Sequence, residues 1–345
     1  MYVEVPNVLR QSGGHFVLRN LLGTSQKVEK SLKGGVLTPV MYLSPERALF
    51  RMVFFEEAGS EFMEEGSSLG RRLVSAVSNA TGVPFTLLME RVRSFNSCEY
   101  ACTCKFVCLA QYAGRLQYRD LHIFEALKTL LFIADREAFY ENLVIEILAL
   151  KAKVDRGFTK DGVSYAPGEL DLWVRLNGGS DLDWYSNHFS PIRYMERNDP
   201  EVKFFDYTKD YYRMVEYLNC IETEFPLNYE LTWSAGSVDR WTAAVMGMNA
   251  GVSPNIDHGN VAVIFREFPA IHDDPYLDLI GEFGYTLIDG TVSDARGLDE
   301  ARSIVCLKPL GRPARKNTTS KFMFNNLADF VQRITRVRKV SEALL

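Results

Sequence analysis

The chain has no run of eighteen or more apolar residues, and its first residues lack the basic and apolar regions of a secretory signal. We therefore expect neither a membrane span nor secretion, which places the protein in the cytoplasm. No G-x-G-x-x-G or Walker A motif follows a predicted strand, and the five histidines form no pair with metal-ligand spacing. These absences argue against the common dinucleotide and P-loop folds and against a histidine metal site.

The composition has no strong bias of charge or polarity. A net charge of -5 gives no global case for nucleic acid binding, and 47% hydrophobic residues with 24% charged residues are typical of a globular protein. At 345 residues, the chain is long enough for one large domain or two small ones.

Four of the six cysteines, Cys98, Cys102, Cys104 and Cys108, lie within one short stretch. A loop can bring their thiolates to one metal ion or cluster, and a reducing cytoplasm disfavours a disulfide framework. The sequence leaves an iron-sulfur cluster, a structural zinc ion and thiols without metal as alternatives. Structural zinc is usually held by two well-separated cysteine pairs, whereas these pairs are separated by Thr103 alone, which favours the cluster. We interpret Cys220 and Cys306 as buried small side chains.

Seven short apolar segments alternate with helical or loop segments, which predicts right-handed crossovers and a parallel sheet. The number of strands favours a full or partial (β/α) TIM-type barrel, within an α/β fold, over a doubly wound sheet. The cysteine loop would follow the first strand, after a helical insertion. The expected strands are residues 36–43, 172–177, 202–207, 229–234, 261–266, 285–289 and 303–308.

The same patterns predict the organisation of the chain. Residues 1–34 form an N-terminal extension, and residues 35–316 form the barrel, with an amphipathic helical insertion at 46–94 and the cysteine loop at 95–115. A long helix with one apolar face is expected over 120–154. Residues 317–345 are expected to form a basic C-terminal helix.

Polar residues follow the predicted strands, and the carboxyl ends of barrel strands form the active sites of such folds. Each aspartate also has a structural interpretation, because Asp is favoured at helix N-caps and in turns. The candidates for substrate handling are Asp206, Lys209, Arg266, Asp289 and Lys308, and those after the second strand are Asn177, Ser180 and Asp181.

The C-terminal segment 311–339 is strongly basic, with a single acidic residue, Asp329. Such a segment suits nucleic acid phosphates. The alternative is a solvated helix face whose apolar side packs on the barrel. The basic residues are Arg312, Arg315, Lys316, Lys321, Arg333, Arg336, Arg338 and Lys339.

Several short blocks in a fixed order resemble a family of bacteriophage-encoded proteins. These include Gly35 to Pro45, the end of the cysteine loop from Cys104 to Leu109, and Ala113 to Arg115. Later blocks are Val174 to Asn177, Phe205 to Lys209, Leu231 to Ser234, Val261 to Arg266, Leu287 to Gly290 and Ile304 to Lys308. The resemblance covers residues 35–45 and 95–316, and implies a protein of the host cell cytoplasm. Residues 46–94 look like an insertion that typical members lack.

The layout is similar to that of radical S-adenosylmethionine (SAM) enzymes, in which three loop cysteines hold a [4Fe-4S] cluster whose open iron binds SAM. The resemblance implies Cys98, Cys104 and Cys108 as ligands, with Cys102 as an alternative or fourth ligand, and SAM contacts by Asn177, Ser180 and Asp181. The usual C-x3-C-x2-C spacing is replaced here by C-x3-C-x-C-x3-C. If all four cysteines bind, no iron stays open.

The implied function is a phage-encoded iron-sulfur, radical SAM-like enzyme acting on a nucleotide, a nucleic acid or another small metabolite. The alternative is a non-enzymatic protein with a structural four-cysteine zinc site, which binds nucleic acid or a host protein.

Overall fold

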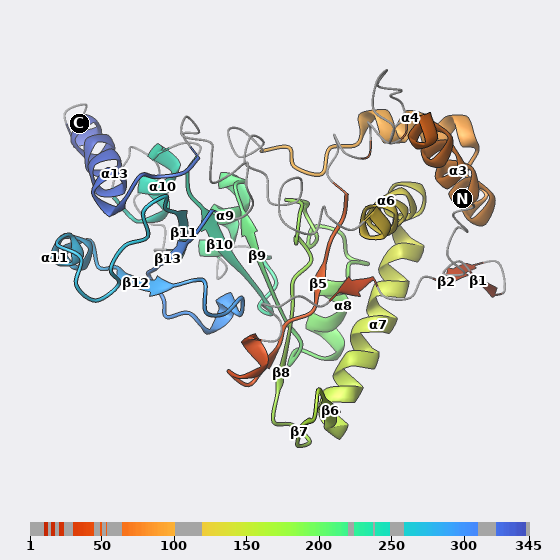
Figure 1. The fold of residues 1–345 in the computed structure, drawn as a ribbon, viewed down its shortest axis with the longest axis horizontal. Coiled ribbons are helices and arrows are strands. Elements are labelled where there is room, and N and C mark those ends of the chain that lie inside the picture. Colours follow the sequence, from red (N-terminus) through yellow and green to blue (C-terminus); the bar gives the residue numbers. More distant parts are fainter. Residues whose placement is uncertain are drawn as a thin grey trace.

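A seven-stranded parallel sheet forms the centre of the fold (Figure 1). The computed structural model describes residues 10–12, 15–17, 21–23, 30–44, 49, 53, 64–100, 119–219, 224–236, 239–248, 259–309 and 322–342. The strand order is β12-β13-β11-β10-β9-β8-β4, so β12 and β4 lie at the two edges. The strands are β4 (Val36–Leu37), β8 (Asp171–Val174), β9 (Lys203–Thr208), β10 (Tyr229–Ser234), β11 (Val261–Ile264), β12 (Thr286–Asp289) and β13 (Ser303–Leu307).

The predicted strands and their parallel pairing are confirmed. The first is interrupted: β4 ends at Leu37, and β5 (Val40–Met41) begins after Thr38 and Pro39. Proline has no N–H to donate to a ladder, so the pairing breaks there. Beyond the break, the Met41 amide donates to the Arg175 carbonyl at 2.8 Å, so this segment still runs along β8.

One face of the sheet packs on helices and forms the main core. Leu172, Phe204, Leu231 and Val263, from four neighbouring strands, are buried in it. Helix α7 packs on β8, and helix α9 packs on β9 and β10. The helices after the strands are α8 (Pro191–Asn198), α9 (Tyr211–Leu218), α10 (Asp239–Val245), α11 (Leu277–Glu282) and the short 3-10 helix η3 (Arg296–Leu298).

The segment after β12 covers part of the opposite face. Its Ala295 forms a buried cluster with Val36, Trp173 and Phe205 of β4, β8 and β9. A Cβ atom at Gly297 would lie 1.6 Å from Cζ3 of Trp173, so only glycine fits this approach. This segment therefore links the two edges of the sheet across one face.

The segment before α13 (Leu327–Glu342) extends the sheet at its carboxyl edge. The Phe324 amide donates to the Ile264 carbonyl, and the Arg266 amide donates to the Phe324 carbonyl, both at 2.9 Å. Gly236, with a φ of 122°, allows the main chain at Phe322 to pass close by. Helix α13 then packs on α10, where Arg333 and Asp239 form an ion pair with a 2.6 Å N–O distance.

The helices that come before β8 in the chain form a layer on one side of the sheet (Figure 1). It contains α3 (Glu64–Thr81), α4 (Phe85–Ser94), α6 (Arg119–Ala134) and α7 (Arg136–Arg156). Gly82, with a φ of 72°, and Pro84 lie in the break between α3 and α4. The single helix predicted over 120–154 is wrong, because Asp135 ends α6 and caps α7 by accepting from the Ala138 amide at 3.1 Å.

Three small two-stranded sheets complete the described fold. They pair β1 (Arg10–Ser12) with β2 (His15–Val17), β3 (Leu22–Gly23) with β5, and β6 (Phe158–Lys160) with β7 (Val163–Tyr165). Among the residues that the structure describes, no helix is long and apolar enough to cross a membrane.

Candidate functional site

The loops after β8 and β9 meet at the carboxyl edge of the sheet, where parallel strands place their ligand sites. Asn177, which is 2% exposed, organises the loop after β8. Its side-chain oxygen accepts from the Ser180 hydroxyl at 2.7 Å, the Leu182 amide at 2.9 Å and the Trp184 indole at 3.0 Å. Its side-chain nitrogen donates to the Leu182 carbonyl at 3.0 Å. This one amide fixes the course of the loop.

Asp206 on β9 lies beneath this loop and is 1% exposed. Its carboxyl group accepts from the Asn177 amide at 2.7 Å and from the Tyr229 hydroxyl at 3.1 Å. Burial raises the pKa of Asp206 to about 7, against the opposing effects of Arg175 and of the hydrogen bonds. The Asp206 carboxyl group therefore titrates near neutral pH, at a buried position beneath the site.

Asp181 and Arg213 form a buried ion pair beside Asp206, with a 2.9 Å N–O distance. Asp181 also accepts from the Thr208 hydroxyl at 3.0 Å and from the Lys209 amide at 2.8 Å. Arg213 lies in the first turn of α9, which Asp210 caps. The ion pair therefore ties the loop after β8 to the end of β9 and to α9.

The start of the cysteine loop contacts this same network. The Asp181 amide donates to the carbonyl of Ser97 at 2.8 Å, and the Cys98 thiol lies 3.9 Å from the Gly179 carbonyl. Burial, followed by the negative charges of Asp210 and Glu99, raises the pKa of Tyr100. The polypeptide from residue 97 to residue 100 thus lies over the ends of β8 and β9.

Gly178 allows the loop after β8 to pass close to β5. A Cβ atom at Gly178 would lie 2.5 Å from the Met41 carbonyl oxygen and 2.6 Å from a methyl group of Val40. No side chain fits without displacing β5 or the loop. The glycine therefore fixes the distance between the first strand and the loop that touches Cys98.

A second charged cluster lies nearby, around Arg175. Its guanidinium group lies 3.7 Å from the Asp294 carboxylate and 4.7 Å from the centre of the Tyr207 ring. Desolvation lowers the pKa of Arg175, but Asp294, Tyr207 and other neighbours outweigh this effect and raise it. Burial raises the pKa of Tyr207 to about 12. Since Asp294 follows β12, this cluster ties the segment after β12 to β8 and β9.

The structure brings Asn177, Ser180, Asp181 and Asp206 into one hydrogen-bonded network, together with the main chain of Lys209. Lys209 and Arg266 both reach the segment before α13: the Lys209 amine lies 5.4 Å from the centre of the Phe322 ring, and the Arg266 amide donates to Phe324. Their roles in substrate handling stay predictions.

Asp289 and Lys308 have other described contacts. Asp289 accepts from the Thr291 amide at 2.8 Å and from the Thr291 hydroxyl at 2.6 Å, the turn role given as its structural interpretation. The Lys308 amine lies 4.5 Å from the centre of the Phe268 ring. No contact described in the structure joins either residue to the Asn177 network.

Sequence reasoning missed Arg213, Tyr229 and Arg175. Arg213 follows the capping residue Asp210 by three positions, which marks the first turn of a helix but not its distant partner. Arg175 lies inside the predicted strand 172–177, in one of the family-like blocks, where the pattern gives no sign of its ion pair with Asp294.

The four cysteines predicted to bind a metal are described only in part. Cys98 is partly buried and forms no disulfide with a described residue, whereas Cys102, Cys104 and Cys108 lie outside the described residues. Within the described ranges, no group of three metal-ligating side chains occurs. The thiol of Cys98, at a loop over the carboxyl edge of the sheet, is a suitable donor for either iron or zinc.

Comparison with known proteins gives the family. The family model described as gene product 88 matches residues 63–326, which is most of the chain. The chain belongs to the gene product 88 family of phage proteins. The match includes the described part of the cysteine loop and every strand from β8 to β13, and begins within the segment predicted as an insertion. No curated protein and no solved structure matches the chain.

Proposed function

We propose that this gene product 88 family member is an iron-sulfur, radical SAM-like enzyme with its cofactor site at the carboxyl edge of the sheet. The observation that carries the proposal is the position of Cys98, which lies against Gly179 in the loop after β8. Cys98, Cys102, Cys104 and Cys108 would supply the thiolates for a [4Fe-4S] cluster. When bound, such a cluster supplies one-electron chemistry to SAM.

The proposed architecture is a partial (β/α) barrel of TIM type. The sequential order β4, β8, β9, β10 and β11 supports it, because successive strands of a barrel lie side by side. The last two strands depart from that order, since β13 lies between β11 and β12. The link between Arg175 and Asp294 also brings the segment after β12 toward the first strands. Closure of the sheet is not required, since a partial barrel keeps one side open to a substrate.

SAM contacts are proposed for Asn177, Ser180 and Asp181. All three side chains engage protein groups, so their contribution would be to hold the main chain beside the cysteine loop in one conformation. Preorganised main-chain groups of residues 178–180 would then face the bound cofactor.

The proposed substrate is a nucleotide or another small anionic metabolite. Lys209 and Arg266 support this, because both are cationic and follow the ends of different strands, β9 and β11. Asp206, with a pKa of about 7, would hold a proton beneath the site. Asp289 and Lys308 are kept as substrate-handling candidates on their strand-end positions alone.

The competing proposal is a structural zinc protein that binds nucleic acid through its basic C-terminal segment. In the described part of that segment, Arg333 pairs with Asp239 and lies 4.1 Å from the centre of the Phe324 ring. These contacts give Arg333 a packing role and so favour the enzyme. The metal content of the purified protein distinguishes the enzyme proposal from the zinc-protein proposal.

The test is the anaerobic absorption spectrum and the iron, sulfide and zinc content of the purified full chain, before and after reconstitution. We expect broad visible absorption that dithionite bleaches, with about four irons per chain. Cys104→Ala and Cys98→Ala should lose the visible absorption and the iron. The matched control Cys306→Ala, which removes a buried thiol on β13, should keep the absorption and the iron. One zinc per chain without visible absorption would overturn the proposal. If the protein holds an iron-sulfur cluster, the next measurement is SAM cleavage.

A further inference from the structure

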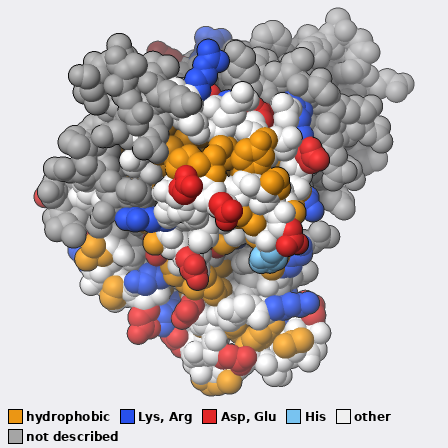
Figure 2. Space-filling model, turned by 90° about the vertical axis from the view of Figure 1, so that its left-hand side faces the viewer, with side chains coloured by type: hydrophobic (Ala, Val, Ile, Leu, Met, Phe, Trp, Pro, Cys, Tyr) orange, Lys and Arg blue, Asp and Glu red, His pale blue; other side chains and the backbone are white. Residues whose placement is uncertain are grey.

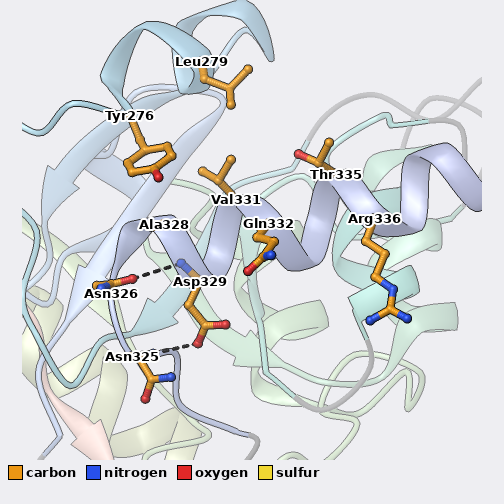
Figure 3. Close-up of a pocket in the computed structure, with 10 residues that line it drawn as sticks. All are labelled: Tyr276, Leu279, Asn325, Asn326, Ala328, Asp329, Val331, Gln332, Thr335 and Arg336. Carbon is orange, nitrogen blue, oxygen red and sulfur yellow. Dashed lines mark hydrogen bonds between the residues drawn. The ribbon is translucent and has the colours of Figure 1, made fainter.

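A groove with a volume of about 980 Å³ runs between α11 and α13, away from the cysteine loop (Figure 3). Its apolar part is formed by Tyr276, which is 37% exposed, by the half-buried Leu279 and by Val331 at the base. Figure 3 shows Tyr276 and Leu279 standing over Val331 of α13. An exposed aromatic ring beside aliphatic side chains is a surface on which a partner's apolar side chain buries favourably.

The stretch of chain that carries α11 is acidic, although the residues that it contributes to the groove lining are Tyr276 and Leu279. The stretch 270–283 contains Asp273, Asp274, Asp278 and Glu282 and no lysine or arginine. Asp278 and Glu282 are exposed, and Glu282 follows Leu279 by three residues, so it lies beside Leu279 on the helix. Figure 2 looks onto the side that carries α11 and α13, and shows hydrophobic side chains gathered in a strip with acidic side chains beside it.

The arginines of α13 do not offset the negative charge of α11 beside Tyr276 and Leu279. Arg333 is held by Asp239, and Arg336 extends away from Tyr276 and Leu279 in Figure 3. The charged residues of the lining itself are Asp329 and Arg336. The exposed carboxylates of α11 therefore favour a basic partner over a phosphate.

The first turn of α13 offers no anion site either. The Asp329 carboxylate accepts from the Asn325 amide at 2.9 Å, and the Asn326 side chain accepts from the Asp329 amide at 3.0 Å. These reciprocal bonds occupy main-chain donors that a phosphate would need. A nucleic acid is thus disfavoured by both charge and hydrogen bonding.

The length of the groove sets the size of its occupant. The lining residues of α13 run from Ala328 to Arg336, which at 1.5 Å per residue spans roughly 12 Å. An extended peptide covers that distance with about four residues. The side-chain amides of Asn325 and Gln332 line the same groove and can bond to a peptide main chain.

We propose that the groove between α11 and α13 binds a short basic peptide segment of a partner protein, with one apolar side chain anchored on Tyr276, Leu279 and Val331. Lysines or arginines on either side of the anchor would face Asp278 and Glu282. The site goes beyond the proposed enzymatic function and does not depend on a metal.

The test uses the full chain and a fluorescein-labelled peptide of lysines around a central leucine, read by fluorescence anisotropy. We expect binding that weakens as salt rises, and that falls about tenfold in the Asp278→Lys/Glu282→Lys variant and about tenfold in Tyr276→Ala. Replacing the leucine with serine, or the lysines with glutamates, should abolish binding. The matched control Glu137→Lys/Glu141→Lys, which reverses two exposed charges on α7, should bind as the native chain does.

Several results would overturn the proposal. Failure of the native chain to bind the lysine peptide is one, and equal binding by the groove and control variants is another. A single-stranded oligonucleotide that binds the native chain more tightly than the peptide, and loses affinity in Tyr276→Ala, would assign the groove to nucleic acid. Self-association by light scattering that Tyr276→Ala abolishes would assign it to a second copy of the chain. Circular dichroism shows whether each variant is folded.

Discussion

The main-chain amide of Asp181 donates a 2.8 Å hydrogen bond to the carbonyl of Ser97, the residue directly before Cys98. This bond joins the loop after β8 to the start of the cysteine loop. Because the Asp181 side chain is itself paired with Arg213 of α9, this buried ion pair helps to hold residues 97 and 98 in place. The fold thus couples the stability of the sheet edge to the geometry of the proposed metal site.

Removing Arg213 should be strongly destabilising. Arg213→Met leaves the buried Asp181 carboxylate without its cation, and we expect a loss of about 3 to 5 kcal/mol in the free energy of unfolding, measured with urea. The double variant Asp181→Asn/Arg213→Met should recover part of this loss, because it also removes the buried Asp181 charge. Recovery should be incomplete, since Asp210 still loses its 3.5 Å ion pair with Arg213. Arg156→Met, at an exposed position of α7, should change stability by less than about 0.5 kcal/mol. A double variant no more stable than Arg213→Met alone would contradict the ion-pair argument.

Asn177 should be the least replaceable residue of the loop. Asn177→Ala removes the acceptor of the Ser180 hydroxyl, the Leu182 amide and the Trp184 indole, so three donors lose this partner. We expect a loss of roughly 2 to 5 kcal/mol in unfolding free energy, with an altered near-ultraviolet circular dichroism signal from Trp184. Ser180→Ala removes one donor and no acceptor, so its cost should be about 1 kcal/mol. Equal costs for the two variants would show that Asn177 does not organise the loop.

The strands were predictable because each is a short apolar run, and a parallel sheet buries both faces of its strands. The grouping of Asn177, Asp181 and Asp206 was predictable for a related reason. Asn177 and Asp181 follow β8, Asp206 lies two residues before the end of β9, and parallel strands end at one edge. The two differences have local causes. Pro39 interrupts the first strand, and Asp135 divides the long helix, since a side chain that caps a helix also begins it.

The partners of the site residues were not predictable. Arg213 lies 32 positions from Asp181, and the pattern of α9 does not show which of its side chains turns toward the sheet edge. The same holds for Tyr229, whose hydroxyl bonds to Asp206 from the first position of β10. The acidic stretch 270–283 is evident in the sequence, but its position beside α13 depends on the tertiary fold.

Gly178 should tolerate no side chain. In Gly178→Ala, the Cβ atom meets the Met41 carbonyl oxygen at 2.5 Å, and main-chain atoms cannot rotate away. We expect a cost of about 1 to 3 kcal/mol in urea unfolding, together with lower iron content if the cluster forms. The matched control is Gly281→Ala in α11, where a Cβ meets nothing within 4 Å. That variant should be neutral or more stable by roughly 0.4 to 1 kcal/mol. A stable Gly178→Ala variant would contradict the close approach.

Asp206 should make the protein less stable as the pH rises. Its pKa is about 7 in the folded chain, against an ordinary value of 3.8 for an exposed aspartate, so between these values the folded state holds a proton that the unfolded state has released. Unfolding free energy should therefore fall from about pH 4 to about pH 7 and level off above. The expected size is on the order of a few kcal/mol.

Asp206→Asn keeps an oxygen to accept from the Asn177 amide and cannot titrate, so the variant should lose this part of the pH dependence. Glu230 and Asp299, whose pKa values burial raises to about 7 and about 6, act in the same direction. The control is therefore Glu230→Gln, and the measured quantity is the difference between each variant and the native chain at each pH. A difference for Asp206→Asn that stays constant from pH 4 to pH 8 would mean that Asp206 is ionised throughout. Its carboxylate would then be stabilised by Arg175 and the hydrogen bonds more strongly than burial disfavours it.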